Sequence, residues 1–255
     1  MYSWRCEMTI SEMAYELKLP NIKMNYQLLL EEAKHTKMSY EEFLYNFLEH
    51  EVLLRKENGV KHRLTNARFP YKKYLEDFNT TEYGVDLREE FEELSSLKFI
   101  AEKGNIILIG SPGSGKTHFS IGLGIKACMQ GLNVLFISVP NLIIELKESM
   151  SLNNLNAYKK KFEKYDLVIL DELGYVSFDK TGCEILFNLL SNRNDKGSII
   201  ITTNLVFDRW EEIFLDPMLT GAMIDRLSYK SHIMDISREV SHRYEETVAW
   251  MNSKK

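Results

Sequence analysis

The sequence predicts an α/β fold: a five-stranded, mostly parallel sheet with helices on both faces, preceded by a small all-helical N-terminal domain. From Asn105 onward, short apolar runs rich in β-branched residues alternate with helical patterns, which is typical of strands buried on both faces. The beginning of the chain instead shows helical spacing and helix-start signals. We therefore expect three parts: a helical N-terminal domain at 1–57, a connector at 58–84 and an α/β domain at 85–255.

Five apolar runs are expected to form the strands. None of them shows the strict alternation of a half-exposed strand. They are Ile106–Ile109, Val134–Ser138, Leu167–Leu170, Ile199–Thr203 and Ile233–Ile236. Helical patterns such as Thr117–Gln130 and Thr181–Ser191 lie between them, so we expect crossover helices between parallel strands.

The N-terminal domain is expected to consist of short helices. Thr9 with Glu12, and Ser39 with Glu42, have the spacing of a capping box, in which a hydroxyl and a carboxylate satisfy two free backbone N–H groups. A domain this small has a limited apolar core, so we expect it to depend on a partner or on the larger domain.

Composition excludes several classes of protein. The 255 residues carry a net charge of −5 and no apolar stretch of about 20 residues, the length that a membrane span needs. Without a signal-peptide pattern at the N-terminus, a cytoplasmic protein is expected. The three cysteines, Cys6, Cys128 and Cys183, are far apart, which argues against a disulfide framework or a cysteine metal site.

The connector is interrupted by Gly59, Pro70 and Gly84 and is expected to be irregular. It overlaps the segment 55–73, which contains seven basic residues and one acidic residue, with aromatic residues between them. A basic stretch on an acidic chain can bind a polyanion, although a solvated linker is the alternative. The DNA-binding candidates here are Arg55, Lys56, Lys61, Arg63 and Arg68.

The segment 110–117 matches the phosphate-binding pattern G-x-x-x-x-G-K-[ST] completely, between an expected strand and an expected helix. Glycines let backbone N–H groups point at phosphate oxygens, and the helix N-terminus adds positive potential. Lys116 is expected to reach the β- and γ-phosphates of ATP, and Thr117 to bind Mg²⁺. The expected nucleotide contacts are Gly110, Ser111, Pro112, Gly113, Ser114, Gly115, Lys116, Thr117 and His118.

Two acidic residues, Asp171 and Glu172, follow an apolar run directly. Ligands bind at the carboxyl ends of strands in open α/β sheets, so both residues are expected beside the phosphates. Asp171 is expected to hold Mg²⁺ through water and Glu172 to orient the attacking water. A glutamate here argues for hydrolysis, because a phosphotransferase must suppress attack by water. Asn204 ends the next run and is expected to sense the γ-phosphate, unless it merely ends the strand.

This order of motifs resembles the AAA+ ATPases, and more closely the IstB family of insertion-sequence ATP-binding helper proteins, relatives of the DnaC helicase loaders. The similarity covers roughly residues 40–245. It rests on Leu167–Tyr175, Thr202–Leu205, Trp210, Phe214 and Met223–Leu227, together with Arg68–Phe78.

The resemblance implies strand order 5-1-4-3-2, hydrolysis of Mg-ATP, ATP-dependent oligomers on duplex DNA, and presentation of target DNA to a partner transposase. It makes Arg226 the arginine finger that completes the ATP site of a neighbouring subunit. An intrachain ion pair with Asp225 or Glu172 is the alternative. Arg193 is a second candidate for an intersubunit contact, and Arg243 for part of a sensor role.

The resemblance also implies an extra helix after the second strand, expected within Pro140–Met150 and Asn153–Lys164. Its basic residues Lys159, Lys160 and Lys161 are further DNA-binding candidates, with a solvated helix face as the equal alternative. In the connector, Phe78 is the candidate for the adenine pocket.

Other functions remain open on the sequence alone. A helicase loader of the DnaC type would share every ATPase motif and differ in what its first 60 residues grip. A P-loop kinase would need a substrate lid, which the sequence does not suggest. A non-catalytic ATP-dependent scaffold on DNA would keep the site and not need turnover.

Overall fold

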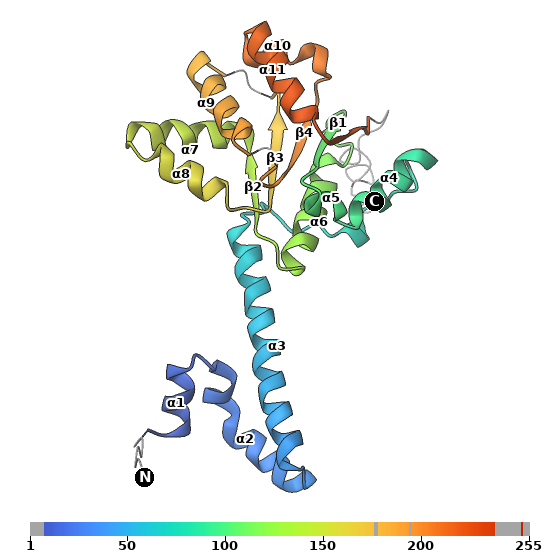
Figure 1. Cartoon of the computed structure of the whole chain (residues 1–255). Coiled ribbons are helices and arrows are strands. Elements are labelled where there is room, and N and C mark those ends of the chain that lie inside the picture. Colours follow the sequence, from blue (N-terminus) through green and yellow to red (C-terminus); the bar gives the residue numbers. More distant parts are fainter. Residues whose placement is uncertain (1–7, 176–177, 194, 238–250, 252–255) are drawn as a thin grey trace. The chain divides into compact units, whose positions relative to one another are not determined.

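The computed structural model describes residues 8–175, 178–193, 195–237 and 251 (Figure 1). The chain forms two compact units, Met1–His62 and Arg63–Lys255. Helix α3 (Tyr40–Asn66) extends past the expected start of the connector at residue 58. The expectation of irregular structure was therefore wrong as far as Asn66. The helix accommodates Gly59, whose cost is only about 1 kcal/mol relative to alanine.

The first unit contains α1 (Ile10–Glu16), α2 (Pro20–Thr36) and most of α3. Both predicted capping boxes are confirmed. The Thr9 N–H donates to Glu12 Oε2 at 2.7 Å, and the Glu12 N–H donates to Thr9 Oγ1 at 3.3 Å. Ser39 and Glu42 exchange the same two bonds at 2.8 and 3.2 Å. In each pair the backbone hydrogen bond lowers the pKa of the glutamate.

A buried glutamate joins two helices of this unit. Glu51 on α3 is 3% exposed, and its Oε2 accepts the N–H groups of Asn21 at 2.9 Å and Ile22 at 3.4 Å. These are N–H groups at the start of α2, where the chain supplies no local side-chain cap. Among the described residues of this unit, the buried apolar side chains are Ala14 and Ile22, so its core is thin, as expected.

The second unit is built on a parallel sheet of five strands (Figure 1). The strands are β1 (Asn105–Ile109), β2 (Val134–Ser138), β3 (Leu167–Leu173), β4 (Ser198–Thr203) and β5 (Ser231–Asp235). Every neighbouring pair is parallel, in the order β2-β3-β4-β1-β5. This is the order 5-1-4-3-2 that the family resemblance implied, read from the other edge.

Successive residues of each strand enter different cores, as the two-residue period of a strand requires. In β1, Ile107 and Ile109 join one cluster, and Ile106 and Leu108 join the other. The first cluster contains residues of α7 (Val139–Ser151), α8 (Leu155–Phe162), α9 (Lys180–Ser191), α10 (Glu211–Phe214) and α11 (Pro217–Ser228). The second contains residues of α4 (Val85–Ser95), α5 (Lys98–Ala101) and α6 (Lys116–Met129). Helices therefore cover both faces, and the extra helix after β2 is present as α8. Short 3-10 helices lie at Leu75–Asp77 (η1) and Phe207–Arg209 (η2).

The segment 67–78 lies against α6 and the edge of the sheet. Ala67 accepts the N–H of Phe136 on β2 at 2.8 Å. Along α6, Gly122 lies under Leu75 and Gly124 under Phe69, and a Cβ at either glycine would approach those side chains to 2.7–2.8 Å. Glycine is unfavourable inside a helix, so these two residues are explained by the close approach of the segment.

No helix among the described residues has both the length and the apolar character that crossing a bilayer demands.

Candidate nucleotide-binding site

The loop between β1 and α6 has the backbone shape of an anion cradle. Gly113 and Gly115 have φ angles of 80° and 93°, a region that L-residues other than glycine avoid. At Gly110 a Cβ would lie 2.7 Å from Ser114 Oγ, so a side chain there would obstruct the turn. The loop ends at the N-terminus of α6, where free N–H groups and the helix dipole favour negative charge.

Lys116 is the charged group of this loop. Its side chain is buried, and Nζ donates to the carbonyl oxygens of Gly110 at 2.6 Å and Ser111 at 2.9 Å. The ammonium group is therefore held at the mouth of the loop by neutral acceptors. Phosphate oxygens are stronger acceptors for an ammonium group than carbonyl oxygens, so the lysine can exchange these bonds for a nucleotide.

A chain of hydrogen bonds links the loop to the ends of two strands. Thr117 Oγ1 donates to Asp171 Oδ1 at 3.0 Å, and Thr202 Oγ1 donates to the same oxygen at 2.6 Å. Thr202 Oγ1 also accepts the backbone N–H of Glu172 at 3.0 Å. Sequence reasoning gave Thr202 no role in the site. Its position at the end of a buried strand was the available signal, but the contact depends on the register between β3 and β4.

Glu172 occupies an irregular position in β3. The β3–β4 pairing shifts register between Leu170 and Leu173, and Glu172 has a φ of 64°. This β-bulge turns the backbone so that Asp171 is 6% exposed while Glu172 is exposed. The two adjacent carboxylates thus lie in different surroundings. Asp171 lies among hydroxyl groups, whereas Glu172 is on the solvent side.

The two residues expected to hold Mg²⁺, Thr117 and Asp171, lie within hydrogen-bond distance of each other. Hydroxyl and carboxylate oxygens suit this hard cation. Among the described residues, no group of three or more His, Cys, Asp or Glu side chains forms a metal site. These residues therefore fit an ion that takes its remaining ligands from phosphate and water rather than from a protein cage.

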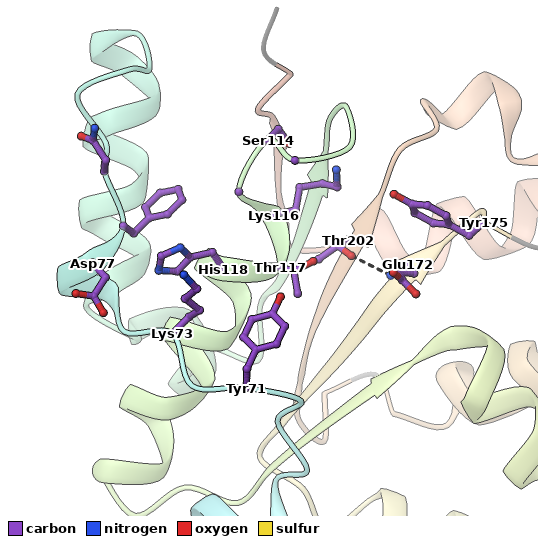
Figure 2. A pocket seen from close by; sticks show the side chains of 14 residues that line it. Tyr71, Lys73, Asp77, Ser114, Lys116, Thr117, His118, Glu172, Tyr175 and Thr202 are labelled. Atoms are coloured by element: carbon purple, nitrogen blue, oxygen red, sulfur yellow. Dashed lines mark hydrogen bonds between the residues drawn. The ribbon is translucent and has the colours of Figure 1, made fainter. Parts of the chain in front are cut away.

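A cavity of about 410 Å³ extends from the loop to Glu172 (Figure 2). Loop residues from Gly113 to Thr117 line it, with Glu172, Tyr175 and Thr202 from the strand ends. The segment 71–79 supplies Tyr71, Lys73, Asp77, Phe78 and Asn79. Figure 2 shows Lys73, Asp77 and His118 on one side of Lys116 and Thr117, and Glu172 and Tyr175 on the other. The cavity therefore has charged groups on both sides of Lys116, with the Tyr71, Phe78 and His118 rings on the side away from Glu172.

Phe78, expected in the adenine pocket, lines the cavity but is only 9% exposed. Its ring packs against Tyr83 at 5.8 Å, His118 at 5.4 Å and Phe119 at 5.2 Å, measured between centroids. A Cβ at Gly115 would lie 2.9 Å from both Phe78 and the Tyr83 hydroxyl. The Tyr83 hydroxyl donates to the Ser114 carbonyl at 2.6 Å, so these aromatic residues support the loop from behind. Tyr83 is a supporting residue that the sequence did not suggest.

Asn204 and Arg226 do not line this cavity. The Oδ1 atom of Asn204 is buried and has no hydrogen-bond partner among the described residues. The guanidinium of Arg226 lies over the Phe187 ring at 4.4 Å and donates to the Ser191 hydroxyl, both on α9. Neither an Arg226–Asp225 nor an Arg226–Glu172 ion pair occurs among the described residues.

Arg193 is a structural residue, which corrects the expectation of an intersubunit contact. It is 0% exposed and donates to the carbonyl oxygens of Phe162 at 2.9 Å, Tyr165 at 2.6 Å and Ser198 at 3.3 Å. Burial lowers its pKa to about 10. A side chain enclosed in this way cannot reach a neighbouring subunit. Arg243 lies outside the described residues.

The DNA-binding candidates are distributed over both units. In the first unit, Arg55 donates to the Lys18 carbonyl at 2.8 Å, and Lys56 and Lys61 are exposed on α3. In the second, Arg63 donates through Nε to the Cys128 carbonyl at 2.8 Å, and Arg68 pairs with Glu145 at 2.8 Å. On α8, Lys159 is half-buried, and Lys160 and Lys161 are exposed. The structure brings Arg63, Arg68 and Lys161 to one cavity.

Comparison with known proteins agrees with this site. The chain matches the family described as IstB-like ATP binding protein over residues 12–248. It is 38% identical over 231 residues to the insertion sequence IS21 ATP-binding protein of Pseudomonas aeruginosa, covering 90% of this chain and 86% of the relative.

Two solved structures are similar to this chain in fold. AMPPCP-bound DnaA from Aquifex aeolicus has a TM-score of 0.57 at 19% identity, over 73% of this chain and 55% of DnaA. The DnaC helicase loader has a TM-score of 0.52 at 18% identity, over 64% of this chain and 95% of the loader. At these identities the likeness concerns the fold alone. With an AAA+ fold, a complete phosphate-binding loop and a family match over most of its length, the chain belongs to the IstB-like ATP-binding proteins of insertion sequences.

Proposed function

We propose that this protein is a Mg²⁺-dependent ATPase that assembles on duplex DNA, largely independently of sequence, and presents target DNA to the transposase of its insertion sequence. One observation carries the hydrolytic part of the proposal. The Thr117–Asp171 hydrogen bond joins the phosphate-binding loop to β3, and Glu172 lines the same cavity as Lys116. Lys116, the proposed phosphate-binding group, and Glu172, the proposed water-activating group, therefore line one cavity.

Each residue has a separate task in this mechanism. Lys116 leaves the Gly110 and Ser111 carbonyl oxygens and binds the β- and γ-phosphates. Thr117 and Asp171 hold Mg²⁺, which when bound neutralises charge on the phosphates. The Glu172 carboxylate accepts a proton from the attacking water and orients it. Asn204 keeps its proposed sensor role on the strength of its place at the end of β4. It does not line the cavity, and its Oδ1 is buried without a hydrogen-bond partner among the described residues, so it would have to turn toward the γ-phosphate.

The Arg226 geometry supports a site shared between subunits. This arginine does not line its own cavity, and it is held by Phe187 and Ser191 rather than by a carboxylate. Its charge is therefore not neutralised by an ion pair among the described residues. We expect it to approach the γ-phosphate in a neighbouring subunit, where it would stabilise developing negative charge.

Mixing two inactive variants tests this arrangement. Glu172→Gln removes the water-activating group, and Arg226→Ala removes the group supplied in trans. Each variant alone should lose most phosphate release, by about 100-fold or more. A mixed oligomer contains some interfaces with an intact Glu172 from one subunit and an intact Arg226 from the other. Mixing the variants with duplex DNA should therefore restore part of the turnover.

Arg209→Ala is the matched control, because Arg209 is an exposed arginine that pairs with Glu212, three residues away, at 2.7 Å. It should hydrolyse ATP at the wild-type rate. If the mixture stays inactive while both variants still assemble, the shared site is wrong. If wild-type turnover depends on neither protein concentration nor DNA, the assembly proposal fails as well.

The transposase is the proposed partner because the family match begins at residue 12 and the IS21 relative covers 90% of the chain. A helicase loader would share the ATPase core and use its first helices to grip a helicase instead. Pull-down with the transposase of the same insertion sequence and with the host replicative helicase separates the two. Capture of the helicase alone would contradict the proposal.

A further inference from the structure

A second cavity, of about 490 Å³, lies at the opposite end of the sheet from the nucleotide site. Its lining includes Asn133 and Val134, where β2 begins, and Lys164 and Tyr165, just before β3 begins. The nucleotide site lies beyond the other ends of the strands. We call the new cavity the basic groove and define it by Arg63, Arg68, Asn133, Lys161, Lys164 and Tyr165.

Charge distinguishes this groove from the nucleotide cavity. Four of its nine lining residues are cationic, and none is acidic. They come from two regions about a hundred residues apart in the sequence: Arg63 and Arg68 before the sheet, and Lys161 and Lys164 at the end of α8 and just after it. Two basic stretches that the sequence presents separately therefore form one surface.

The carboxylates close to the groove do not pair with its lysines, although one of them pairs with its Arg68. Glu145 accepts from Arg68 at 2.8 Å and from the Tyr158 hydroxyl at 2.8 Å. Glu163 pairs with Lys196 at 3.1 Å. The Asp166 carboxylate accepts the N–H of Asn133 at 2.8 Å. None of these three acids forms an ion pair with Lys161 or Lys164 in the described part of the chain.

The cations of the groove differ in how they are held. Arg63 is anchored through Nε to the Cys128 carbonyl at 2.8 Å, which directs its terminal nitrogen atoms without using them. Lys161 and Lys164 are exposed, and neither has an ion-pair partner within the described part of the chain. The groove therefore combines an anchored arginine with two exposed lysines. Asn66, Asn133 and Thr65 add amide and hydroxyl groups. This combination suits a ligand with repeated negative charges.

We propose that the basic groove binds the phosphodiester backbone of nucleic acid. In the assembled protein, we propose that this backbone belongs to duplex DNA. This inference rests on the proposed function, and it joins Lys161 and Lys164 to Arg63 and Arg68 in one DNA contact, which their separation in the sequence does not show. Phosphate contacts of this kind position a protein on DNA without reading its sequence. The chain path also connects the two sites, because Arg68 lines the groove and Tyr71, three residues later, lines the nucleotide cavity.

The test is the double variant Lys161→Gln/Lys164→Gln, which removes two charges and leaves the anchored arginine in place. Binding is measured by fluorescence anisotropy with a labelled duplex and a labelled single strand of equal length, in the presence of an ATP analogue. We expect duplex affinity to fall by about tenfold at moderate salt. The slope of log Kd against log salt should fall by about two, since each phosphate contact contributes about 0.9.

The matched control is Lys98→Gln/Lys180→Gln, two exposed lysines on α5 and α9 that do not line the groove. It should bind DNA like the wild type, and thermal unfolding of both double variants should show that the fold is retained. If the double variant loses affinity for the single strand alone, the groove still binds a phosphodiester backbone, but that backbone belongs to single-stranded and not to duplex DNA. Unchanged affinity and salt slope in Lys161→Gln/Lys164→Gln, with normal binding by the wild type, would overturn the groove and leave the ATPase proposal standing. Absence of DNA binding by the wild type would overturn the groove and also the proposed assembly on DNA.

Discussion

The Thr202 hydroxyl donates a 2.6 Å hydrogen bond to Asp171, and through the same oxygen it accepts the N–H of Glu172. One side chain on β4 therefore fixes both acidic residues at the end of β3. The bulge in β3 makes this necessary, because a residue with a φ of 64° cannot pair its N–H in the regular ladder. Thr202 thus positions the two groups for which we propose magnesium binding and water activation.

Thr202→Val is expected to reduce turnover more than nucleotide affinity. Valine has a similar shape but leaves the Glu172 N–H unpaired, which costs about 1–3 kcal/mol of folding stability. Misplacement of the catalytic carboxylate by a fraction of an ångström to 1 Å lowers turnover by about 10- to 100-fold. Phosphate release and nucleotide affinity measured on the same preparation separate the two effects.

Thr202→Ser is the control, because it keeps the hydroxyl and should keep most of the turnover. Equal losses in Thr202→Val and Thr202→Ser would mean that packing of the threonine methyl group, rather than the hydrogen bonds, is what matters.

Gly122→Ala is expected to destabilise the second unit, although alanine normally stabilises a helix by about 1 kcal/mol relative to glycine. A Cβ at this position would lie 2.7 Å from Leu75 Cδ2 and 3.2 Å from the Leu75 backbone nitrogen. Relieving that overlap costs about 1–3 kcal/mol, which exceeds the gain in helix propensity. The free energy of unfolding in urea measures the balance.

Gly221→Ala on α11 is the matched helix substitution, because nothing lies within 4 Å of its Cβ position. It should stabilise the protein by about 0.5–1 kcal/mol. Combining Gly122→Ala with Leu75→Ala should cost less than the sum of the single changes. A stabilising Gly122→Ala would show that the segment 67–78 does not lie on α6 in solution.

Much of the fold follows from the sequence because its signals are local. The five apolar runs became five strands, and the phosphate-binding loop lies where its flanking strand and helix required. Helix α3 was underestimated because Gly59 looks like an interruption, while the exposed residues around it favour a helix. Helix propensity alone does not decide whether a single glycine ends a helix or lies within it.

The site could be predicted only in part. Lys116, Thr117, Asp171 and Glu172 are identified by motif spacing, and the structure brings them around one cavity or into direct contact. The role of Thr202 depends on cross-strand register, and the burial of Arg193 depends on where three distant carbonyl groups converge. Such contacts are set by tertiary packing, which a single sequence does not display.

Arg193→Leu is expected to destabilise the protein by about 3–5 kcal/mol while leaving the nucleotide site intact. Three carbonyl oxygens would lose their donor inside the protein, and each unmet group costs about 1–3 kcal/mol before relaxation. Urea unfolding measures the loss. Arg209→Leu, at an exposed arginine paired with Glu212, should cost less than about 1 kcal/mol. A stable Arg193→Leu variant that fails to assemble would instead restore the intersubunit role.

Cys128 is expected to resist alkylation in the native protein. It is fully buried, and burial raises the pKa of its thiol to about 11, because the charged thiolate is poorly solvated there. The reactive form is the thiolate, so at pH 8 only about one molecule in a thousand carries it. As pH rises toward 11 the native thiol should become reactive, whereas a thiol in the unfolded chain reacts about two units lower. The same burial raises the pKa of Cys183.

The measurement uses a Cys6→Ser variant, so that Cys128 and Cys183 are the only thiols, and counts iodoacetamide adducts by mass spectrometry. At pH 8 the native protein should remain unmodified over the time in which the urea-unfolded protein gains two adducts. The direction of the pKa shift determines how stability depends on pH. Because the folded pKa of Cys128 lies above the unfolded value, its thiol binds protons more tightly in the folded state. The corresponding stability is present at neutral pH and is lost as pH rises through the folded pKa. Rapid labelling of Cys128 at pH 8 would mean that the contact between α6 and the Arg63 segment opens in solution, since Arg63 donates to the Cys128 carbonyl at 2.8 Å.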